Sequence, residues 1–308
     1  MRILVLGAGG TGGYFGGRLA EAGADVTFLV RPARAARLAE TGLVIKSPTG
    51  DAALAVRTVT ADRLDGHYDV VMLSCKAYDL ADAIAAIAPA VGPDTMVLPI
   101  LNGLAHYEAL DAAFGRERVV GGLCHIFATL GPAGEILIMG KIHRLTFGER
   151  DRGASPRTEA LAALCAKASF DTVHTPELMQ EAWEKYVLLA PLAGMTCLMR
   201  ADIGTIMATT DGLSITHEMF GECVAVATAA GHAPRPQARD LALIVLTDPK
   251  SRQTASMLRD LEAGGRTEGD HVLGDMLRRA QAAGLATPLL RLAHAHVQAY
   301  EIGRRARE

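Results

Sequence analysis

The chain opens with a strand-like apolar run, Arg2-Ile3-Leu4-Val5-Leu6, that leads directly into Gly7-Ala8-Gly9-Gly10-Thr11-Gly12. After these glycines the apolar residues recur at helical spacing as far as Leu19. A second apolar run, Val26-Thr27-Phe28-Leu29-Val30, then ends at Arg31. The opening segment therefore predicts a complete β-α-β unit of about thirty residues, which is the length of a dinucleotide-binding half.

The glycines match a Gly-x-Gly-x-x-Gly pattern in which each has a physical task. Gly7 allows a tight turn, Gly9 lets the backbone approach a pyrophosphate, and Gly12 lets the helix pack closely on the strand. Such a pattern alone also occurs in turns that bind no ligand, but here it lies between a strand and a helix. We therefore predict that the amides of the turn and the helix dipole bind the phosphates of a dinucleotide, through Gly7, Ala8, Gly9, Gly10, Thr11 and Gly12.

The residue after the second strand indicates which dinucleotide binds. NAD enzymes usually place an acid there for the ribose 2′-hydroxyl, whereas an arginine accommodates a 2′-phosphate. This chain has Arg31, followed by Arg34 and Arg37, and its first acid is Glu40. Because a guanidinium grips a phosphate with two parallel hydrogen bonds, we predict NADPH/NADP+ as the cofactor. The alternative is that these arginines form the solvated face of the following helix, which applies more to Arg34 and Arg37 than to Arg31.

Composition limits the classes of function. The 308 residues are 50% hydrophobic and 21% charged, which is typical of a globular chain long enough for two domains. The net charge is -3 and no run of Lys or Arg is sustained, so neither a nucleic acid nor a membrane surface is indicated as a partner. The five cysteines are scattered, which predicts a reduced, cytoplasmic protein without disulfides or a metal site.

Two segments could be mistaken for membrane signals. The N-terminal apolar run is short and stops at the glycines, as a strand does and a signal peptide does not. Residues 186–199 form the longest apolar segment, but it is too short to cross a bilayer and contains Pro191 and Gly194. We therefore expect no membrane span.

The remaining pattern divides the chain into an α/β part and a helical part. A hairpin is predicted over residues 43–56, and an antiparallel addition to the sheet over residues 134–138 and 144–148. Residues 158–168 and 171–175 are expected to complete the first domain as a helix and a strand. Helical periodicity then takes over in residues 177–200, 210–231, 236–247, 271–284 and 288–305. The predicted fold is a Rossmann-type doubly wound sheet in residues 1–175 plus an all-helical domain in residues 176–308.

Polar residues follow two buried strand candidates of the first domain. Lys76 comes directly after the apolar run of residues 68–74, and Asn102-Gly103 follows the run of residues 96–101. In doubly wound sheets the ligand lies beyond the carboxyl ends of the strands. Each residue alone would be an ordinary turn residue, but together with the glycine turn they are expected to face the ligand.

At this point the sequence resembles the ketopantoate reductases over essentially its whole length. In the helical domain Lys185 lies in a largely apolar helix, where alone it would be a lysine with its charged end at the surface. The resemblance rests on the glycine motif, Arg31, Lys76, Asn102-Gly103, Trp183-Glu184-Lys185, Ser256-Met257-Leu258-x-Asp260 and Arg266-Thr267-Glu268.

The resemblance implies an activity and a set of roles. These enzymes use NADPH to reduce 2-dehydropantoate, a 2-oxo acid, to pantoate in the route to pantothenate and coenzyme A. The resemblance makes Lys185 the proton donor, places Asn102 against both cofactor and substrate and Ser256 against the substrate carboxylate, and gives Lys76 and Glu268 contacts to the cofactor. An ammonium suits that role because hydride transfer to a ketone leaves negative charge on its oxygen.

The chain departs from the family at the residues that read the substrate. The family usually has Asn four and eight residues after the catalytic lysine, and this chain has Leu189 and Ala193. A further Asn expected before a glycine is Ile203, ahead of Gly204. Amide side chains form hydrogen bonds with substrate hydroxyls and are left unpaired by a substrate that lacks them. Their loss therefore predicts weak activity on ketopantoate or a preference for a 2-oxo acid with a more apolar tail.

Two other readings stay open. A related opine or 3-hydroxy-acid dehydrogenase could share the domain plan, although Ser256 and Arg266-Thr267-Glu268 argue against it. A non-catalytic NADPH sensor would keep the glycine turn and Arg31 but would have no use for Lys185 and Glu268. The sequence also leaves a homodimer open.

Overall fold

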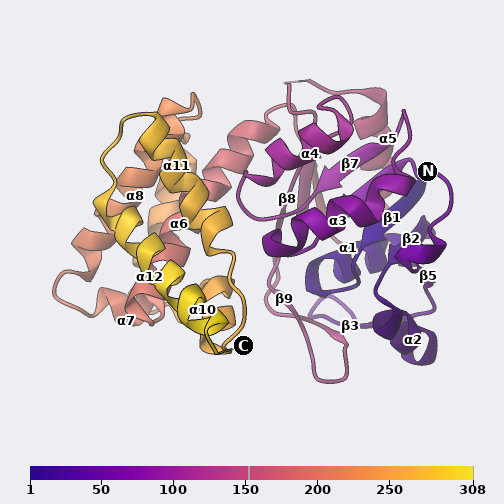
Figure 1. The fold of residues 1–308 in the computed structure, drawn as a ribbon, viewed down its shortest axis with the longest axis horizontal. Coiled ribbons are helices and arrows are strands. Elements are labelled where there is room, and N and C mark those ends of the chain that lie inside the picture. Colours follow the sequence, from indigo (N-terminus) through magenta and orange to yellow (C-terminus); the bar gives the residue numbers. More distant parts are fainter. Residues whose placement is uncertain (152, 308) are drawn as a thin grey trace. The chain divides into compact units, whose positions relative to one another are not determined.

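The computed structural model describes residues 1–151 and 153–307. The chain forms two compact units, of which the first comprises Met1–Leu101 and His106–Leu178 and the second Asn102–Ala105 and Met179–Glu308. The first unit is built on a parallel sheet with helices and the second is helical (Figure 1), which confirms the predicted fold class. The sequence did not predict that the short loop Asn102–Ala105 belongs with the helical unit.

The core of the first unit is a five-stranded parallel sheet. Its order is β5 (Arg57–Val59), β2 (Asp25–Leu29), β1 (Arg2–Leu6), β6 (Val70–Leu73) and β7 (Met96–Pro99). The chain builds outward from β1 first on one side and then on the other. This order creates a switch point between β1 and β6, which is where doubly wound sheets bind ligands.

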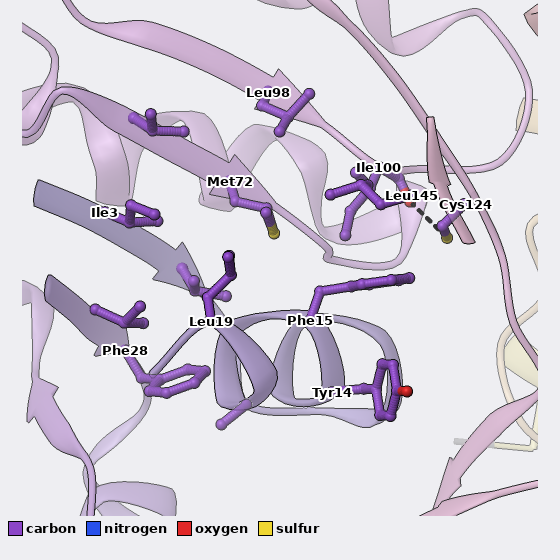
Figure 2. Packing of buried hydrophobic residues seen from close by; sticks show 14 of the residues in the cluster. Ile3, Tyr14, Phe15, Leu19, Phe28, Met72, Leu98, Ile100, Cys124 and Leu145 are labelled. Carbon is purple, nitrogen blue, oxygen red and sulfur yellow. Dashed lines mark hydrogen bonds between the residues drawn. The ribbon is translucent and has the colours of Figure 1, made fainter. Parts of the chain in front are cut away.

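One face of this sheet is covered by α1 (Gly10–Glu21). Ile3, Met72 and Leu98 come from three neighbouring strands, and Phe15 and Leu19 of α1 reach toward them (Figure 2). The intervening residues of the same strands are equally buried. Burial on both faces explains why these strands read as near-continuous apolar runs rather than alternating ones.

Two smaller sheets extend the first unit. One has the order β4 (Ala52–Leu54), β3 (Leu43–Lys46), β10 (Ile136–Ile138) and β9 (Ala128–Leu130), and its antiparallel β3–β4 pair is the predicted hairpin. The other has the order β12 (Asp171–His174), β11 (Arg144–Gly148) and β8 (Gly121–His125). The Val120 amide donates to the Val97 carbonyl at 3.0 Å, so the strand that leads into β8 joins the edge of the main sheet at β7.

The predicted antiparallel addition of residues 134–138 and 144–148 is wrong as a pair. Strand β10 is antiparallel to β9 and parallel to β3, whereas β11 is antiparallel to β8 and parallel to β12. The reason is that apolar alternation fixes which face of a strand is buried but does not choose its neighbour. The two segments therefore contribute to different sheets.

The observed helices at Pro156–Cys165, Leu178–Met199, Gly212–Ala229, Pro236–Thr247 and Pro288–Arg305 lie close to predicted ones, whereas those at His106–Phe114, Ile203–Met207 and Ser256–Glu262 were not predicted. In the first unit the remaining helices are α2 (Pro32–Thr41), α3 (Leu80–Ile87), α4 (His106–Phe114) and α5 (Pro156–Cys165), with short 3-10 turns at Ala61–Arg63, Ala77–Asp79 and Ala88–Ala90. The helical unit continues with α6 (Leu178–Met199), α7 (Ile203–Met207), α8 (Gly212–Ala229), α9 (Pro236–Thr247), α10 (Ser256–Glu262), α11 (Asp275–Ala282) and α12 (Pro288–Arg305). None of the helices in residues 1–151 and 153–307 has the length and hydropathy needed to cross a bilayer.

The helix predicted over residues 271–284 begins differently. Its first turn is the π-helical segment η4 (Asp270–Gly274), which precedes α11. Two glycines let this segment lie against α12, since a Cβ at Gly269 would overlap Val297 and one at Gly274 would lie 2.9 Å from His294 Nε2. Apolar spacing over a single turn does not distinguish a π-helix from an α-helix, and π-turns often occur at functional sites.

Glycines also bring α1 close to the strands. A Cβ added at Gly16 would lie 2.8 Å from the Phe28 ring and 2.9 Å from Val5, and one at Gly17 would lie 2.8 Å from Leu43. These distances are shorter than carbon atoms tolerate. The position of α1, and hence of the glycine turn before it, depends on these missing side chains.

We predict that Gly16→Ala destabilises the protein, because the added methyl group must displace Phe28 or Val5. The expected loss in the free energy of unfolding is about 1–3 kcal/mol, measured by urea denaturation. Gly221→Ala in α8 is the control: a Cβ there meets nothing within 4 Å, so we expect a gain of about 0.5–1 kcal/mol from helix propensity alone. Equal stability of both variants would contradict the close packing of α1.

Candidate active site

The glycine turn that follows β1 has the backbone geometry of a phosphate cradle. Gly7 adopts a φ of +88°, which favours glycine, and its amide donates to the Leu29 carbonyl at 2.9 Å. Gly9 is the N-cap of α1, and no side chain caps the helix or places an acid in its first turn. The first amides of α1 therefore retain the positive end of the helix dipole without a competing carboxylate.

The other side of the turn is closed. A Cβ at Gly12 would overlap Ser74 Oγ and lie 3.0 Å from the Gly7 carbonyl oxygen, and one at Gly10 would lie 3.1 Å from the backbone of Ala128. In contrast, a Cβ at Gly9 would meet nothing within 4 Å. The open side of the turn is thus at Gly9, where the sequence predicts the pyrophosphate, so the turn fits a dinucleotide.

Ser74 helps to fix this turn, a role that its place in a strand did not indicate. Leu6 of β1 is paired in register with Leu73 of β6, and Ser74 Oγ donates to the Leu6 carbonyl at 2.9 Å. Lys76 follows two residues later as the half-buried N-cap of the 3-10 turn Ala77–Asp79. Lys76 therefore leaves the sheet at the same edge as the glycine turn, on the neighbouring strand.

The three arginines after β2 differ in their surroundings. Arg31 is the N-cap residue of α2 and its side chain is 83% exposed. Its Nη2 lies 3.6 Å from Asp79 Oδ2. Arg34 is half-buried, and its Nη2 donates to the carbonyl of Ala8 at 2.9 Å. Burial, and after it the charge of Arg37, lowers the pKa of Arg34. The solvated-face alternative is therefore wrong for Arg34, which contacts the glycine turn itself, whereas Arg37 is exposed.

In the helical unit, the structure brings Lys185 and Asn102 together. Lys185 lies half-buried on α6, and its Nζ donates to Asn102 Oδ1 at 3.2 Å. The carboxylate of the neighbouring Glu184 instead accepts hydrogen bonds from Arg235 Nε and Nη2 at 2.7 and 2.6 Å. Burial raises the pKa of Glu184, but the hydrogen bonds from Arg235 outweigh it and the net pKa is lowered. Glu184 is thus an anion held by Arg235.

The three positions where the family usually carries amides are not equivalent. Ala193 and Ile203 are 2% and 0% exposed, so they belong to the packed interior of the helical unit. Leu189 is half-buried, one helical turn from Lys185 on α6. Of the three, Leu189 has the clearest access to a ligand bound at Lys185.

Ser256 and Glu268 lie in different settings. Ser256 is the half-buried first residue of α10, and its side chain makes no hydrogen bond within the described residues. Glu268 is 8% exposed and lies two residues before the start of η4. Its neighbour Thr267 donates through its amide and Oγ1 to Glu301 Oε1 of α12, at 2.6 and 2.9 Å, which fixes this segment.

The sequence missed His271, which lies one turn after Glu268. Its amide donates to the Glu268 carbonyl at 3.1 Å, and a Cβ at Gly103 would lie 3.3 Å from its Cδ2. Burial lowers the pKa of His271, against the charge of Glu268 and a hydrogen bond with the Asn102 backbone, which both raise it. The one available signal was its spacing from Glu268, but a lone histidine in a helical pattern normally indicates packing.

The groups described above offer hydrogen bonds and positive charge. The helical unit supplies an ammonium beside an amide oxygen, and the first unit supplies a turn suited to phosphates. In residues 1–151 and 153–307 no group of His, Cys, Asp or Glu is arranged to hold a metal ion, and no disulfide joins the cysteines. The arrangement suits binding of a dinucleotide and donation of a proton to an oxygen that becomes negative.

Comparison with known families agrees with both parts of the chain. Residues 3–152 match the family described as "Ketopantoate reductase PanE/ApbA", and residues 177–301 match its C-terminal domain, "Ketopantoate reductase PanE/ApbA C terminal". Together these matches cover most of the sequence.

Individual relatives are similar over their full lengths. An uncharacterized oxidoreductase of Bacillus subtilis, YkpB, is 38% identical over 98% of this chain and 99% of its own. The 2-dehydropantoate 2-reductase of Pyrococcus horikoshii is 28% identical over 98% of each chain. The crystal structure of 2-dehydropantoate 2-reductase from Geobacter metallireducens has a TM-score of 0.87 at 30% identity, covering 97% of this chain and 99% of that one.

Proposed function

The chain belongs to the ketopantoate reductase family of oxidoreductases, and we propose from this that it reduces a 2-oxo acid to a 2-hydroxy acid with NADPH. The observation that carries the proposal is the hydrogen bond from Lys185 Nζ to Asn102 Oδ1, at 3.2 Å in a half-buried position. A surface lysine has no need of such a partner. An ammonium held by an amide oxygen is oriented to donate its other protons.

Binding of the cofactor phosphates is assigned to the first unit. The turn from Gly7 to Gly12 holds the pyrophosphate, with Gly9 at its open side, and Arg31 holds the 2′-phosphate. Lys76, Asn102 and Glu268 contact the cofactor as the family resemblance implies. We add Arg34 to this set as the residue that fixes the Ala8 carbonyl. When bound, NADPH supplies the hydride that reaches the carbonyl carbon of the substrate.

Lys185 performs the acid step of the reaction. Its ammonium donates a hydrogen bond to the substrate carbonyl oxygen, stabilises the negative charge that develops there, and transfers a proton to it. Asn102 holds the ammonium in place through Oδ1. Ser256 binds the substrate carboxylate, a group for which its side chain has no competing hydrogen bond in the described residues.

The substrate is proposed to have a less polar tail than ketopantoate. Leu189 offers no hydrogen bond to a substrate hydroxyl, and Ala193 and Ile203 lie in the interior. Ketopantoate itself remains the runner-up substrate because relatives that carry the name 2-dehydropantoate 2-reductase match along the whole chain. A pocket without amides gains no hydrogen bond from a substrate hydroxyl and leaves no polar group unpaired when the hydroxyl is absent.

The roles of the two domains, the location and the oligomeric state form part of the same proposal. We assign cofactor binding to residues 1–175 and substrate binding to residues 176–308, in a cytoplasmic enzyme that acts as a monomer or a homodimer. The free cysteines support the reduced compartment. A non-catalytic NADPH sensor is the competing function, and it predicts NADPH binding without turnover of any 2-oxo acid.

Lys185→Ala should lower kcat by about 10²–10⁴-fold, because the variant loses both the proton and the charge that stabilises the developing oxyanion. NADPH oxidation at 340 nm with a panel of 2-oxo acids measures the rate, and tryptophan fluorescence checks that NADPH still binds. Lys250→Ala removes an exposed lysine of the same unit and should change neither quantity. Full activity of Lys185→Ala would contradict the catalytic assignment.

Substitutions of Arg31 and Arg34 should have different effects on KM for NADPH and for NADH. Arg31→Ala should raise KM for NADPH about tenfold and leave KM for NADH unchanged, since only NADPH carries the 2′-phosphate. Arg34→Leu should raise KM for both cofactors about tenfold, because both bind at the turn that Arg34 fixes. Steady-state kinetics with each cofactor measure this, with Arg37→Leu as the exposed control. The assignment fails if Arg31→Ala weakens NADH and NADPH equally.

Leu189→Asn should raise kcat/KM for ketopantoate about tenfold and lower it for 2-oxo acids with aliphatic or aromatic tails, because it supplies an amide one turn from Lys185. Leu188→Asn makes the same chemical change on another face of α6 and should not alter the preference. Competition between ketopantoate and the panel measures the ratio. If the unmutated protein prefers ketopantoate by orders of magnitude, the proposal of an apolar substrate is wrong.

A further inference from the structure

The loop that carries Asn102 lies directly on His271 of η4. Gly103 has a φ of +73°, and a Cβ there would lie 3.3 Å from both Cδ2 and the carbonyl oxygen of His271. The His271 ring also forms a hydrogen bond with the backbone of Asn102. Because this bond favours the protonated ring, the ring is its donor and the Asn102 carbonyl its acceptor. The backbone of Asn102 is therefore held by a side chain from a distant part of the sequence.

A second contact joins the same two segments. Tyr186, next to Lys185 on α6, donates its hydroxyl to the carbonyl of Val272, next to His271 on η4, at 2.6 Å. Tyr186 is 1% exposed, and burial raises its pKa well above the ordinary value, with a further contribution from the charge of Asp275. The raised pKa favours the protonated hydroxyl, which is the form that donates to Val272.

Together these contacts form a closed cycle through five residues. Lys185 Nζ binds the Asn102 side chain, the Asn102 backbone binds His271, and the Val272 carbonyl binds Tyr186, which is bonded to Lys185. In a closed cycle each contact restrains the movement of the other members. The cycle fixes the Asn102 side chain, and through it the direction of the ammonium.

We propose that His271 is a positioning residue that holds the Asn102–Gly103 loop so that Asn102 Oδ1 can orient the Lys185 ammonium. This inference rests on the proposed role of Lys185 as proton donor. His271 does not touch the reacting atoms in this scheme. Its contribution is to the geometry of the hydrogen bond between Lys185 and Asn102, which is shorter-lived if the loop is free to move.

The charge state of His271 suits this task. Burial lowers its pKa, against the charges of Glu268 and Asp275, and Arg278 lowers it further. A ring that is neutral at neutral pH still carries one N–H, so it can donate to the Asn102 carbonyl without placing a second positive charge near Lys185. A lysine or arginine at this position would donate as well but would repel the ammonium.

The test measures the pKa of Lys185 directly in the full-length protein without cofactor, by ¹⁵N NMR of the lysine ammonium groups across pH. In His271→Leu the loop loses its donor, so Asn102 Oδ1 should hold the ammonium less often and the pKa of Lys185 should fall by about one pH unit. His271→Asn keeps an N–H donor near the position of Nδ1 and should restore the pKa. The same variants should show kcat reduced about tenfold in His271→Leu and restored in His271→Asn.

His294→Leu is the matched control for a merely structural effect. His294 also contacts η4, through a 2.8 Å bond from Nε2 to Asp270, but from α12 and without a described contact to Asn102. It should leave the pKa of Lys185 unchanged even if it lowers the melting temperature. An unchanged Lys185 pKa in His271→Leu, or an equal change in His294→Leu, would overturn the proposal. Absence of turnover in the unmutated protein would instead reject the proposed function and leave the NMR result standing.

Discussion

The hydrogen bond between Lys185 and Asn102 is the interaction on which this account depends. An ammonium that is partly removed from water must recover hydrogen bonds or lose its charge. Asn102 supplies one acceptor at 3.2 Å. The residues on either side of Lys185 have other partners, since Glu184 is engaged by Arg235 and Tyr186 is anchored on Val272.

The glycine turn imposes a different constraint in the first unit. Its backbone can approach a phosphate only because side chains are absent where Ser74, Ala128 and the strands lie within contact distance of α1. The same absence costs backbone entropy, which the close packing of α1 on the sheet must offset. Arg34 donates a hydrogen bond from its charged guanidinium to the Ala8 carbonyl. The turn is therefore held both by the packing of α1 and by this hydrogen bond.

Much of the fold could be predicted from the sequence, for identifiable reasons. Strand β1 and helices α9 and α12 have the predicted bounds because strong apolar patterns end at glycine or proline signals. The partners of β10 and β11 could not be predicted, since three to five apolar residues choose a face and not a neighbour. The π-turn η4 was missed because its glycines act through α12, far along the sequence.

The candidate site also contains some residues that could be predicted from the sequence and others that could not. Gly7, Gly9 and Gly12 could be assigned tasks from spacing alone, and Asn102 could be placed near the ligand from its position after a buried strand. Lys185 required the family resemblance, because it does not stand out in its own segment. The contacts of Arg34 and His271 depend on which distant segments fold against them, and no local pattern encodes that. The apolar residues at the usual amide positions also needed the structure, which separates the half-buried Leu189 from the interior Ala193 and Ile203.

The most direct test of the central claim is a crystal structure of the protein with NADP+ and a 2-oxo acid analogue that cannot be reduced. The account predicts that Lys185 Nζ lies about 3 Å from the analogue's keto oxygen while it keeps Asn102 Oδ1 as its second partner. A Lys185 side chain that points into bulk solvent, with the analogue held elsewhere, would contradict the account.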